Sequence, residues 1–528
     1  MAAAQSSSSP ENSQYHHFIP QFILRNFAHP YRSPTGKGRA KRLSNRGSQK
    51  KTGLYPGDSV LHVIDLSNDN PELAESPIRR TFGLTDMYRD FAKASDQHYL
   101  EKQLSKLESQ TAMIISKILK AFNSGNQAVW ISRQERDDLR KFLFIMKYRG
   151  KGFHERFVGD EVKGYVEDDK EKFMKYMQEK GFQKPLDLWF HSIKVILELK
   201  MDHKGEWMKS LINRLYPDDA LWFIMHTEWM YLALCTPSGT GTEFILTENC
   251  YNVCEGPQTV LVDPITGERR YGLWTNYHEF SPVSPKLMMV LRSFVLPNSE
   301  EDMNESIKRW RETMYKLCIS QHANPAAANS ILADLPVKKP RNSYSSVGSH
   351  RIELLEGEDG SRRSYHWFCF QFFKLSTEHV NKINTIMLEN SHTCQAIAFT
   401  SQSALRMTIE YYLTLPASQG FKLVGDKAND PKLSYLSKLE HILKKLGSDK
   451  CLVYQSHSAK PIDDGIFEIM GNKLIEYLPE QPNEFMQLYM KLGEPPSGGQ
   501  RSFLTECPQA EARQQLLRTW SNHVEWLT

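Results

Sequence analysis

The chain has 528 residues, of which 40% are hydrophobic and 11% aromatic, enough for about two to four folded domains. Lysine and arginine number 66 against 62 acidic residues, and this near balance gives no global indication of a nucleic-acid partner. The eight cysteines include no Cys-x-x-Cys pair, which argues against a disulfide framework or a structural zinc site. Neither a signal-peptide pattern nor an apolar run of about 18 residues occurs, so we expect a soluble intracellular protein, cytoplasmic or nuclear, with no membrane partner.

Two polar segments near the N-terminus are expected to lie outside the core. Residues 1–14 are small and polar, which predicts a disordered tail. From residue 32 to 51 the chain is basic and contains no acidic residue, and interrupting glycine, serine and proline predict a loop. Such a loop fits a nuclear-import or nucleic-acid patch, but no aromatic residues alternate with its charges as a single-strand binding surface requires. We therefore favour a solvated surface insertion.

Two strongly patterned helices follow a predicted strand at Leu61–Leu66. Apolar residues recur at three- and four-residue steps over Leu100–Phe122, the spacing of a helix packed against a core. Ser132–Glu135 is a capping box and predicts the start of a second helix, whose apolar side spans Leu139–Met146. Residues 155–215 are predicted to form further helices.

Short apolar stretches between about 220 and 295 predict a small, mostly antiparallel sheet. Leu221–Cys235 is rich in aromatic residues and predicts one or two buried strands. Glu243–Thr247 and Lys286–Arg292 predict two more, the latter entered through Ser281–Pro285.

The remaining third of the chain is predicted to be mainly helical. Helices are expected at 301–322 and 376–413, separated by a loop or linker at 323–350 that is rich in Ala, Asn, Ser and Pro. Residues 416–528 are more polar and predict a helical extension with helices at 435–446 and around 516–526. The predicted fold class is α+β and predominantly helical, with helical N- and C-terminal parts around the sheet.

The most specific pattern in the chain is Tyr15–Phe27, which directly follows the polar tail. It contains His17, Pro20 and the string Phe22-Ile-Leu-Arg-Asn-Phe27. Proline suits the first position of a short helix, because its missing N–H is not needed there. We expect the apolar residues to bury this segment, with His17 just before the helix.

This pattern and two later blocks resemble the family called domain of unknown function 4238. The motif residues carried over from the resemblance are His17, Pro20, Leu24, Arg25, Asn26 and Phe27. The second block, a helix that ends in a basic site, is similar to Lys106–Glu108 and Phe142–Arg149. The third, a strand ending in Thr-Ser-Asp-x-Pro and followed by a Pro-Leu-Ser-Pro strand, is similar to Phe244–Cys250 and Ser281–Pro285.

The third block departs from the family pattern, with Glu248 in place of the usual aspartate and with the proline missing. The resemblance covers roughly residues 15–415 and leaves 416–528 as an extension. The family carries no established activity, so the resemblance implies no reaction.

Two interpretations of the motif residues remain open. Arg25, Arg149 and Glu108 lie on or beside apolar helix faces, where charged groups must be paired, so they can form a purely structural ion network. Alternatively, His17, both arginines and Glu248 converge on an anion-binding pocket. In that pocket arginine binds phosphate oxygens, His17 or Glu248 moves a proton, and Thr247 adds a hydroxyl.

The second interpretation predicts a hydrolase or transferase that acts on a phosphate-containing or nucleic-acid substrate. The first predicts a non-catalytic binding or scaffold protein. The His-His-x-x-Pro string is also similar to the start of His-Asn-His nucleases, but the downstream Asn and His are missing at the required spacing. Cys250, Cys254 and His278 lack a zinc-site spacing. We therefore predict no metal site and leave the cofactor and the question of catalysis open.

Overall fold

The computed structural model describes residues 13–32, 54–91, 96–159, 167–262, 269–320, 322, 328–348, 352–416, 421–425 and 430–457. Three predictions lie wholly or mostly outside these residues: the tail at 1–14, the basic loop at 32–51 and the C-terminal helix around 516–526. None of the helices in the described part of the chain has the length and hydrophobicity needed to cross a bilayer.

The largest sheet has seven strands drawn from distant parts of the chain. Its order is β14 (Arg341–Asn342), β17 (Trp367–Leu375), β7 (Met230–Pro237), β13 (Leu287–Ser293), β12 (His278–Ser284) and β9 (Cys254–Glu255), and β6 (Ala128–Ser132) also pairs with β17. Only β17 and β7 are parallel among these described pairs. Strands β7 and β13 are buried on both faces because helices cover the sheet.

A second sheet has five antiparallel strands. Its order is β2 (His29–Pro30), β3 (Ser59–Asp65), β18 (Ala396–Phe399) and β8 (Leu246–Thr247), while β4 (Glu72–Pro77) pairs with the other edge of β3. Four two-stranded sheets complete the described strands: β1 (Tyr15–His17) with β5 (Gly83–Thr85), β10 (Gln258–Val262) with β11 (Arg269–Trp274), β15 (Ser345–Val347) with β16 (Ile352–Leu354), and β19 (Leu423–Gly425) with β20 (Gln455–His457).

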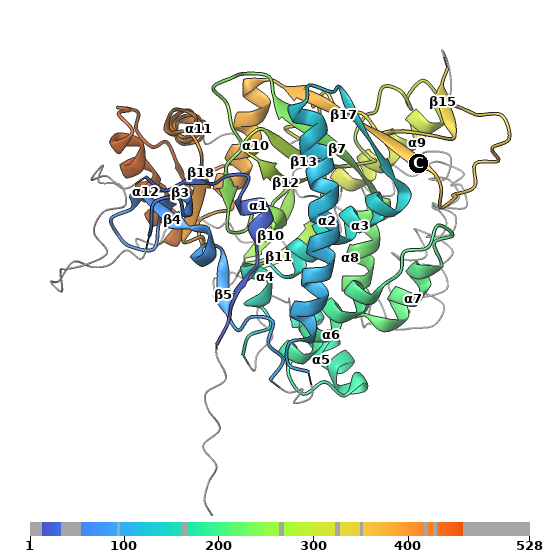
Figure 1. Cartoon of the computed structure of the whole chain (residues 1–528), viewed down its shortest axis with the longest axis horizontal. Coiled ribbons are helices and arrows are strands. Elements are labelled where there is room, and N and C mark those ends of the chain that lie inside the picture. The colour runs from blue at the N-terminus through green and yellow to red at the C-terminus, as the bar shows by residue number, and fades with distance from the viewer. Residues whose placement is uncertain are drawn as a thin grey trace, which may run out of the picture.

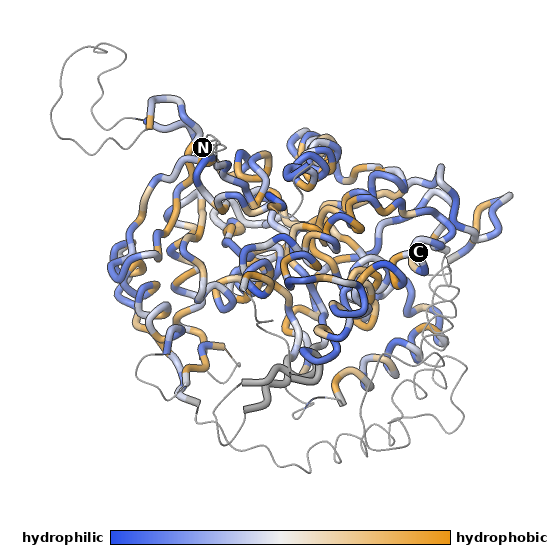
Figure 2. Tube along the Cα trace, turned by 90° about the horizontal axis from the view of Figure 1, so that it is seen from below, coloured by the Kyte–Doolittle hydropathy of each residue, from blue (hydrophilic) through white to orange (hydrophobic). Residues whose placement is uncertain are grey.

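The helices surround the two larger sheets. They are α1 (Gln21–Leu24), α2 (Tyr99–Asn123), α3 (Arg133–Tyr148), α4 (Lys151–His154), α5 (Glu167–Lys180), α6 (Pro185–Glu198), α7 (Glu206–Arg214), α8 (Pro217–Glu228), α9 (Glu305–Ser320), α10 (Thr377–Glu389), α11 (Gln402–Thr414) and α12 (Pro431–Lys445). Helices α2, α3 and α6 contact one another beside the seven-stranded sheet, whereas α11 and α12 lie with the five-stranded sheet at one end of the molecule (Figure 1). Along the helices the chain alternates between hydrophobic and hydrophilic stretches, as expected for helices with one buried side (Figure 2).

The two strongly patterned helices form as the sequence predicts. The apolar stripe of α2 is buried, and the helix ends at Ser124 before Gly125, which adopts a positive φ of 76°. In α3 the Ser132 hydroxyl accepts from the Glu135 N–H, and the Glu135 carboxylate accepts from the Ser132 N–H, so the predicted capping box is complete.

Several predictions of the fold are wrong in detail. The chain is not predominantly helical: its N-terminal part contains β1–β5, and its main sheet is neither small nor confined to residues 220–295. Residues 221–228 belong to helix α8 rather than to a strand, because Pro217 and two following aspartates start a helix there. The region 376–413 contains strand β18 between two helices, and the predicted linker at 323–350 contains β14 and β15.

The N-terminal motif closes over the core and joins the three blocks of the family pattern. Ile23, Leu24 and Phe27 are buried, and Pro20 precedes the short helix α1 rather than forming its first residue. The Phe22 ring lies 5.8 Å from the ring of Phe142 in the second block. The Asn26 side-chain amide donates a 2.9 Å hydrogen bond to the Val283 carbonyl in the third block.

Candidate functional site

A cleft separates the N-terminal motif from one face of helix α2. Its volume is about 490 Å³. It is lined by motif residues, by Tyr88 and by α2 residues three or four apart: Tyr15, His16, His17, Gln21, Phe22, Arg25, Tyr88, Glu101, Leu104, Ser105, Glu108, Ser109 and Ala112. We call this space the motif cleft.

His17 is held in one tautomer at the edge of the motif cleft. Its Nδ1 lies 3.1 Å from the Thr81 carbonyl, which can only accept, so Nδ1 carries the proton and donates it. Arg25 donates to the Gln21 side-chain carbonyl at 3.3 Å, which leaves the Gln21 amide to donate to Nε2 of His17 at 3.0 Å. Burial lowers the pKa of His17, and the nearby Arg149 charge acts in the same direction. His17 is therefore neutral, with Nε2 as its hydrogen-bond acceptor and the Gln21 amide as the donor to it.

His16 has the opposite tautomer. Its Nδ1 accepts a 3.0 Å hydrogen bond from the Tyr88 backbone N–H, so the proton of the neutral ring is on Nε2. That Nε2 lies 3.5 Å from the Glu101 carboxylate and has no hydrogen-bond partner among the described residues. His16 is buried, and burial lowers its pKa.

The two arginines of the family pattern lie in different environments. Arg149 is 1% exposed and donates to the Glu108 carboxylate at 2.6 Å. Burial alone would lower the pKa of Arg149, but Tyr88 and Glu108 together raise it above the ordinary value. Arg25 is exposed and contacts Gln21 rather than a carboxylate. The structure thus pairs buried Arg149 with the partly exposed Glu108, and it leaves Arg25 outside this ion pair at the mouth of the motif cleft.

Glu248 and Thr247 do not line the motif cleft. Glu248 accepts from the Gln395 backbone N–H at 2.8 Å and lies 3.7 Å from the Lys151 ammonium group. Burial raises the pKa of Glu248, and its charge reaches Tyr15 electrostatically. The Thr247 hydroxyl is buried and donates to the Asn249 side chain at 2.8 Å. No hydrogen bond or ion pair joins either residue to His17 in the described part of the chain.

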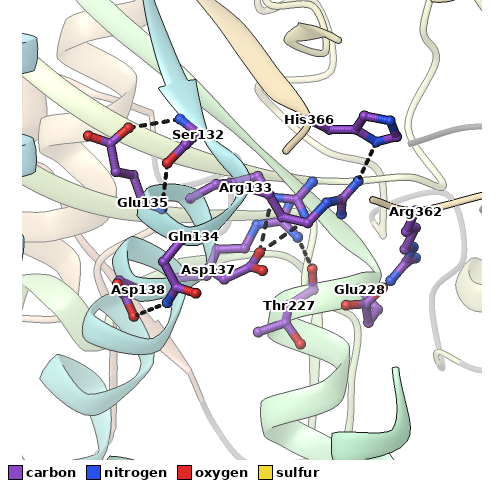
Figure 3. A network of polar contacts seen from close by, with 12 residues as sticks. Ser132, Arg133, Gln134, Glu135, Asp137, Asp138, Thr227, Glu228, Arg362 and His366 are labelled. Carbon is purple, nitrogen blue, oxygen red and sulfur yellow. Dashed lines mark hydrogen bonds and ion pairs between the residues drawn. The ribbon is translucent and has the colours of Figure 1, made fainter. Parts of the chain in front are cut away.

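A second polar region lies along the first turns of α3, which follow the capping box (Figure 3). Arg133, Arg136 and Arg140 are three and four residues apart, so they share one side of the helix, and all three are buried. Together with Arg362, Asp137 and Glu228 they form what we call the arginine cluster.

Most of the arginine cluster is held by backbone carbonyls rather than by carboxylates. Arg133 donates to the Arg363 carbonyl at 2.8 Å and lies beside His366. Arg140 donates to the Thr227 and Met230 carbonyls, and its Nε has no partner among the described residues. Within the described part of the chain, Arg136 lies within ion-pair distance of Asp137 and Arg362 within that of Glu228, whereas neither Arg133 nor Arg140 has such a carboxylate.

The arginine cluster therefore brings four positive charges against two negative ones. Burial and the charge of Arg136 lower the pKa of Arg140 to about 9, and burial and the same neighbour lower that of Arg133 to about 10. Burial alone would raise the pKa of Glu228, but the charges of Arg362 and Arg140 lower it. A buried site with an excess of cations attracts an anion.

The cluster opens on a cavity of about 540 Å³, which we call the α3 cavity. Its charged lining includes Arg136, Arg140 and Lys339 as well as the acids Glu300, Glu301 and Asp359. Burial lowers the pKa of Lys339 to about 8, although Glu301 lies 2.7 Å from its ammonium group and acts in the opposite direction. The Tyr231 hydroxyl and the Asn298 side-chain amide belong to lining residues and lack hydrogen-bond partners among the described residues. Three further lining residues are large, apolar and exposed: Trp130, Val347 and Leu354.

The residues that line the α3 cavity are not among the site residues predicted from the sequence. One signal was available, because Arg133, Arg136 and Arg140 repeat with helical spacing in a helix whose apolar residues predict deep burial. Their partners could not be found in that way, since Arg133 and His366 are 233 positions apart.

These features define a mixed α/β protein in which an N-terminal motif closes one polar cleft and helix α3 borders a second cavity with its buried arginines. A family model described as protein of unknown function (DUF4238) matches residues 15–403, so the chain belongs to this family and the resemblance is confirmed. Comparison with curated proteins and with solved structures gives no match.

Proposed function

We propose that the protein binds a phosphate-containing ligand with an aromatic or apolar group, such as a nucleotide, in the α3 cavity. The observation that carries this proposal is the excess of buried guanidinium groups over carboxylates in the arginine cluster. Arginine binds phosphate oxygens with charge-assisted hydrogen bonds, and a partly desolvated site strengthens them.

The rest of the cavity suits the other end of such a ligand. Trp130 is 49% exposed and offers an aromatic face, with Val347 and Leu354 as further apolar contacts. A cavity of about 540 Å³ lies in the range of small-molecule sites. A nucleotide would place its base on the apolar side and its phosphates toward Arg136 and Lys339.

Titration calorimetry with ATP, GTP, AMP and inorganic pyrophosphate tests this proposal. Arg136→Gln is expected to weaken nucleotide binding about tenfold or more, because it removes one charged donor. Trp130→Ala should weaken nucleotides but leave pyrophosphate binding unchanged. Arg309→Gln, at an exposed site on α9, is the matched control and should bind as the wild type does. Absence of saturable binding, or equal binding by Arg136→Gln and the wild type, would overturn the proposal.

A second candidate function is hydrolase or transferase chemistry in the motif cleft, with His17 as the proton acceptor. It is favoured by the fixed tautomer, in which the Thr81 carbonyl holds Nδ1–H. The Nε2 lone pair, which accepts from the Gln21 amide, would take a proton once a substrate displaces that amide. Arg25 at the mouth would contact the phosphate of the substrate. The competing interpretation is that the same residues only hold the motif onto the core.

His17→Ala and Arg25→Ala separate these two interpretations of the motif. Each variant is compared with the wild type for thermal shifts caused by the same nucleotides and for its unfolding midpoint in urea. Loss of the ligand shift with normal folding supports a site in the motif cleft. Loss of folding without a specific ligand effect supports a structural role.

A further inference from the structure

The five-stranded sheet carries a cluster of two histidines and one glutamate that neither candidate site uses. His62 lies on β3 directly opposite Glu75 on β4, and His29 on β2 pairs in register with Val60, two positions from His62. Side chains two apart on a strand share a face, so all three project from the same side of the sheet. They line a cavity of about 290 Å³ together with Pro30 and Arg32.

The donor atoms of these side chains converge. One ligand atom from each of His29, His62 and Glu75 lies within 4.8 Å of the other two. The His29 and His62 rings stack with centroids 3.9 Å apart, and Nε2 of His29 is 2.8 Å from the Glu75 carboxylate. In a tetrahedral metal site with bonds of about 2.0–2.1 Å, donor atoms stand about 3.3 Å apart, so small side-chain adjustments would bring all three into coordination.

We propose that His29, His62 and Glu75 bind a divalent transition-metal ion of the Zn²⁺ class and leave a coordination position open to solvent. Two imidazoles and one carboxylate are a ligand set that such ions take, often with water in the remaining position. Placement on three adjacent strands fixes the ligands on rigid elements.

The immediate surroundings agree with an accessible site. All three ligands are partly exposed, so an ion can enter without unfolding the sheet. Phe399, which pairs in register with His62, also stacks against the His62 ring with centroids 5.6 Å apart and limits its rotation. Arg32 is exposed and lines the same cavity, where its charge could bind an anion at the open position. Sequence spacing alone predicted no metal site, because 33 positions separate His29 from His62 and no local motif joins them.

The competing explanation is a plain surface hydrogen bond between His29 and Glu75 with His62 stacked beside it. Calorimetric titration of the metal-free full-length protein with Zn²⁺ separates the two. We expect one equivalent to bind, with affinity at least tenfold lower in His62→Ala, His29→Gln and Glu75→Gln. Glu72→Gln, an exposed site on the same strand, and His203→Ala, outside the sheet, are the matched controls and should bind Zn²⁺ as the wild type does.

Co²⁺ spectroscopy supplies an independent readout, because the protein also has cysteines that bind soft ions. The proposed site predicts visible Co²⁺ bands without thiolate charge-transfer absorption, and these bands should disappear in Glu75→Gln. Urea unfolding of each metal-free variant verifies that the sheet is intact, and His29→Gln and Glu75→Gln alter partly exposed groups only. Unchanged Zn²⁺ affinity in the folded variants, thiolate absorption, or no saturable binding by the wild type would overturn the proposal.

Discussion

Buried arginines lie beside both the motif cleft and the α3 cavity, but their positive charge is neutralised differently in the two regions. Arg149 beside the motif cleft has its own carboxylate, Glu108, at 2.6 Å. Near the α3 cavity, Arg133 and Arg140 donate to backbone carbonyls, which do not neutralise their positive charge, while Arg136 has Asp137 beside it. The same residue type can therefore stabilise a fold in one region and prepare a ligand site in another, and the number of nearby carboxylates distinguishes the two roles.

The largest expected effect comes from breaking the ion pair between Arg149 and Glu108. Glu108→Ala leaves the Arg149 guanidinium buried without its acid, so the free energy of unfolding should fall by about 3 kcal/mol. Urea unfolding followed by circular dichroism measures this loss. Glu206→Ala on α7, where the side chain is 65% exposed, is the control and should change stability by less than about 0.5 kcal/mol. A small effect of Glu108→Ala would show that Arg149 does not depend on this pair.

The next effect is a dependence on pH at the α3 cavity. Burial lowers the pKa of Lys339 from 10.5 to about 8, so between these values the unfolded chain binds more protons than the folded one. The contribution of Lys339 to stability therefore rises as pH increases through this window. In Lys339→Met the unfolding free energy should increase between about pH 8 and 10 by roughly 2 kcal/mol less than in the wild type.

Urea unfolding at several pH values, for the wild type and for two variants, tests the Lys339 prediction. Lys338→Met is the neighbouring control, since Lys338 is 45% exposed and pairs with Glu300. If both variants follow the wild-type curve, Lys339 is not held at a lowered pKa. A bound phosphate should raise that pKa, because it adds a second negative charge to that of Glu301, which lies 2.7 Å from the Lys339 ammonium group.

Helices with complete local signals could be predicted from the sequence, whereas the main sheet could not. The apolar stripe of α2 and the capping box of α3 are each formed by residues that lie close together in the sequence, and both helices form as predicted. Strand β17 holds the seven-stranded sheet together, yet its partners β6 and β7 lie more than 100 positions away. The run from Leu221 was ambiguous, because a short apolar stretch suits a buried strand and a buried helix equally well.

Prediction of the candidate sites has the same limit, because the sequence indicates local relations but not contacts between distant segments. The border position of Glu108 on the α2 stripe and of Arg149 at the end of α3 indicated that each needs a partner, and the structure pairs them. No local pattern could show that Glu248 lies outside the motif cleft or that Tyr231 and Asn298 line the α3 cavity, because those placements depend on tertiary packing.

A smaller effect should follow from separating the motif from the third family block. Asn26→Ala removes the donor of the 2.9 Å hydrogen bond to the Val283 carbonyl on buried strand β12. The unpaired carbonyl should cost about 1.5 kcal/mol of stability, measured by urea unfolding. Asn126→Ala, at an exposed position after α2, is the control and should have little effect. Equal stability of the two variants would show that the motif is held by its apolar residues alone.

The smallest expected effect is at Arg25. It tests whether Arg25 stabilises the fold, as we expect of Arg149, or binds a ligand, as we propose for the arginines of the α3 cavity. Arg25 is exposed, and its side chain hydrogen-bonds only to Gln21 among the described residues, so Arg25→Ala should change the unfolding free energy by less than about 0.5 kcal/mol. A small stability effect together with loss of the nucleotide-induced thermal shift would assign Arg25 to contact with a ligand. A loss above about 1 kcal/mol would instead assign Arg25 to holding Gln21 and His17 in place. Arg25→Lys separates charge from geometry: it keeps the charge, but without the planar guanidinium group it should bind a phosphate ligand more weakly than the wild type.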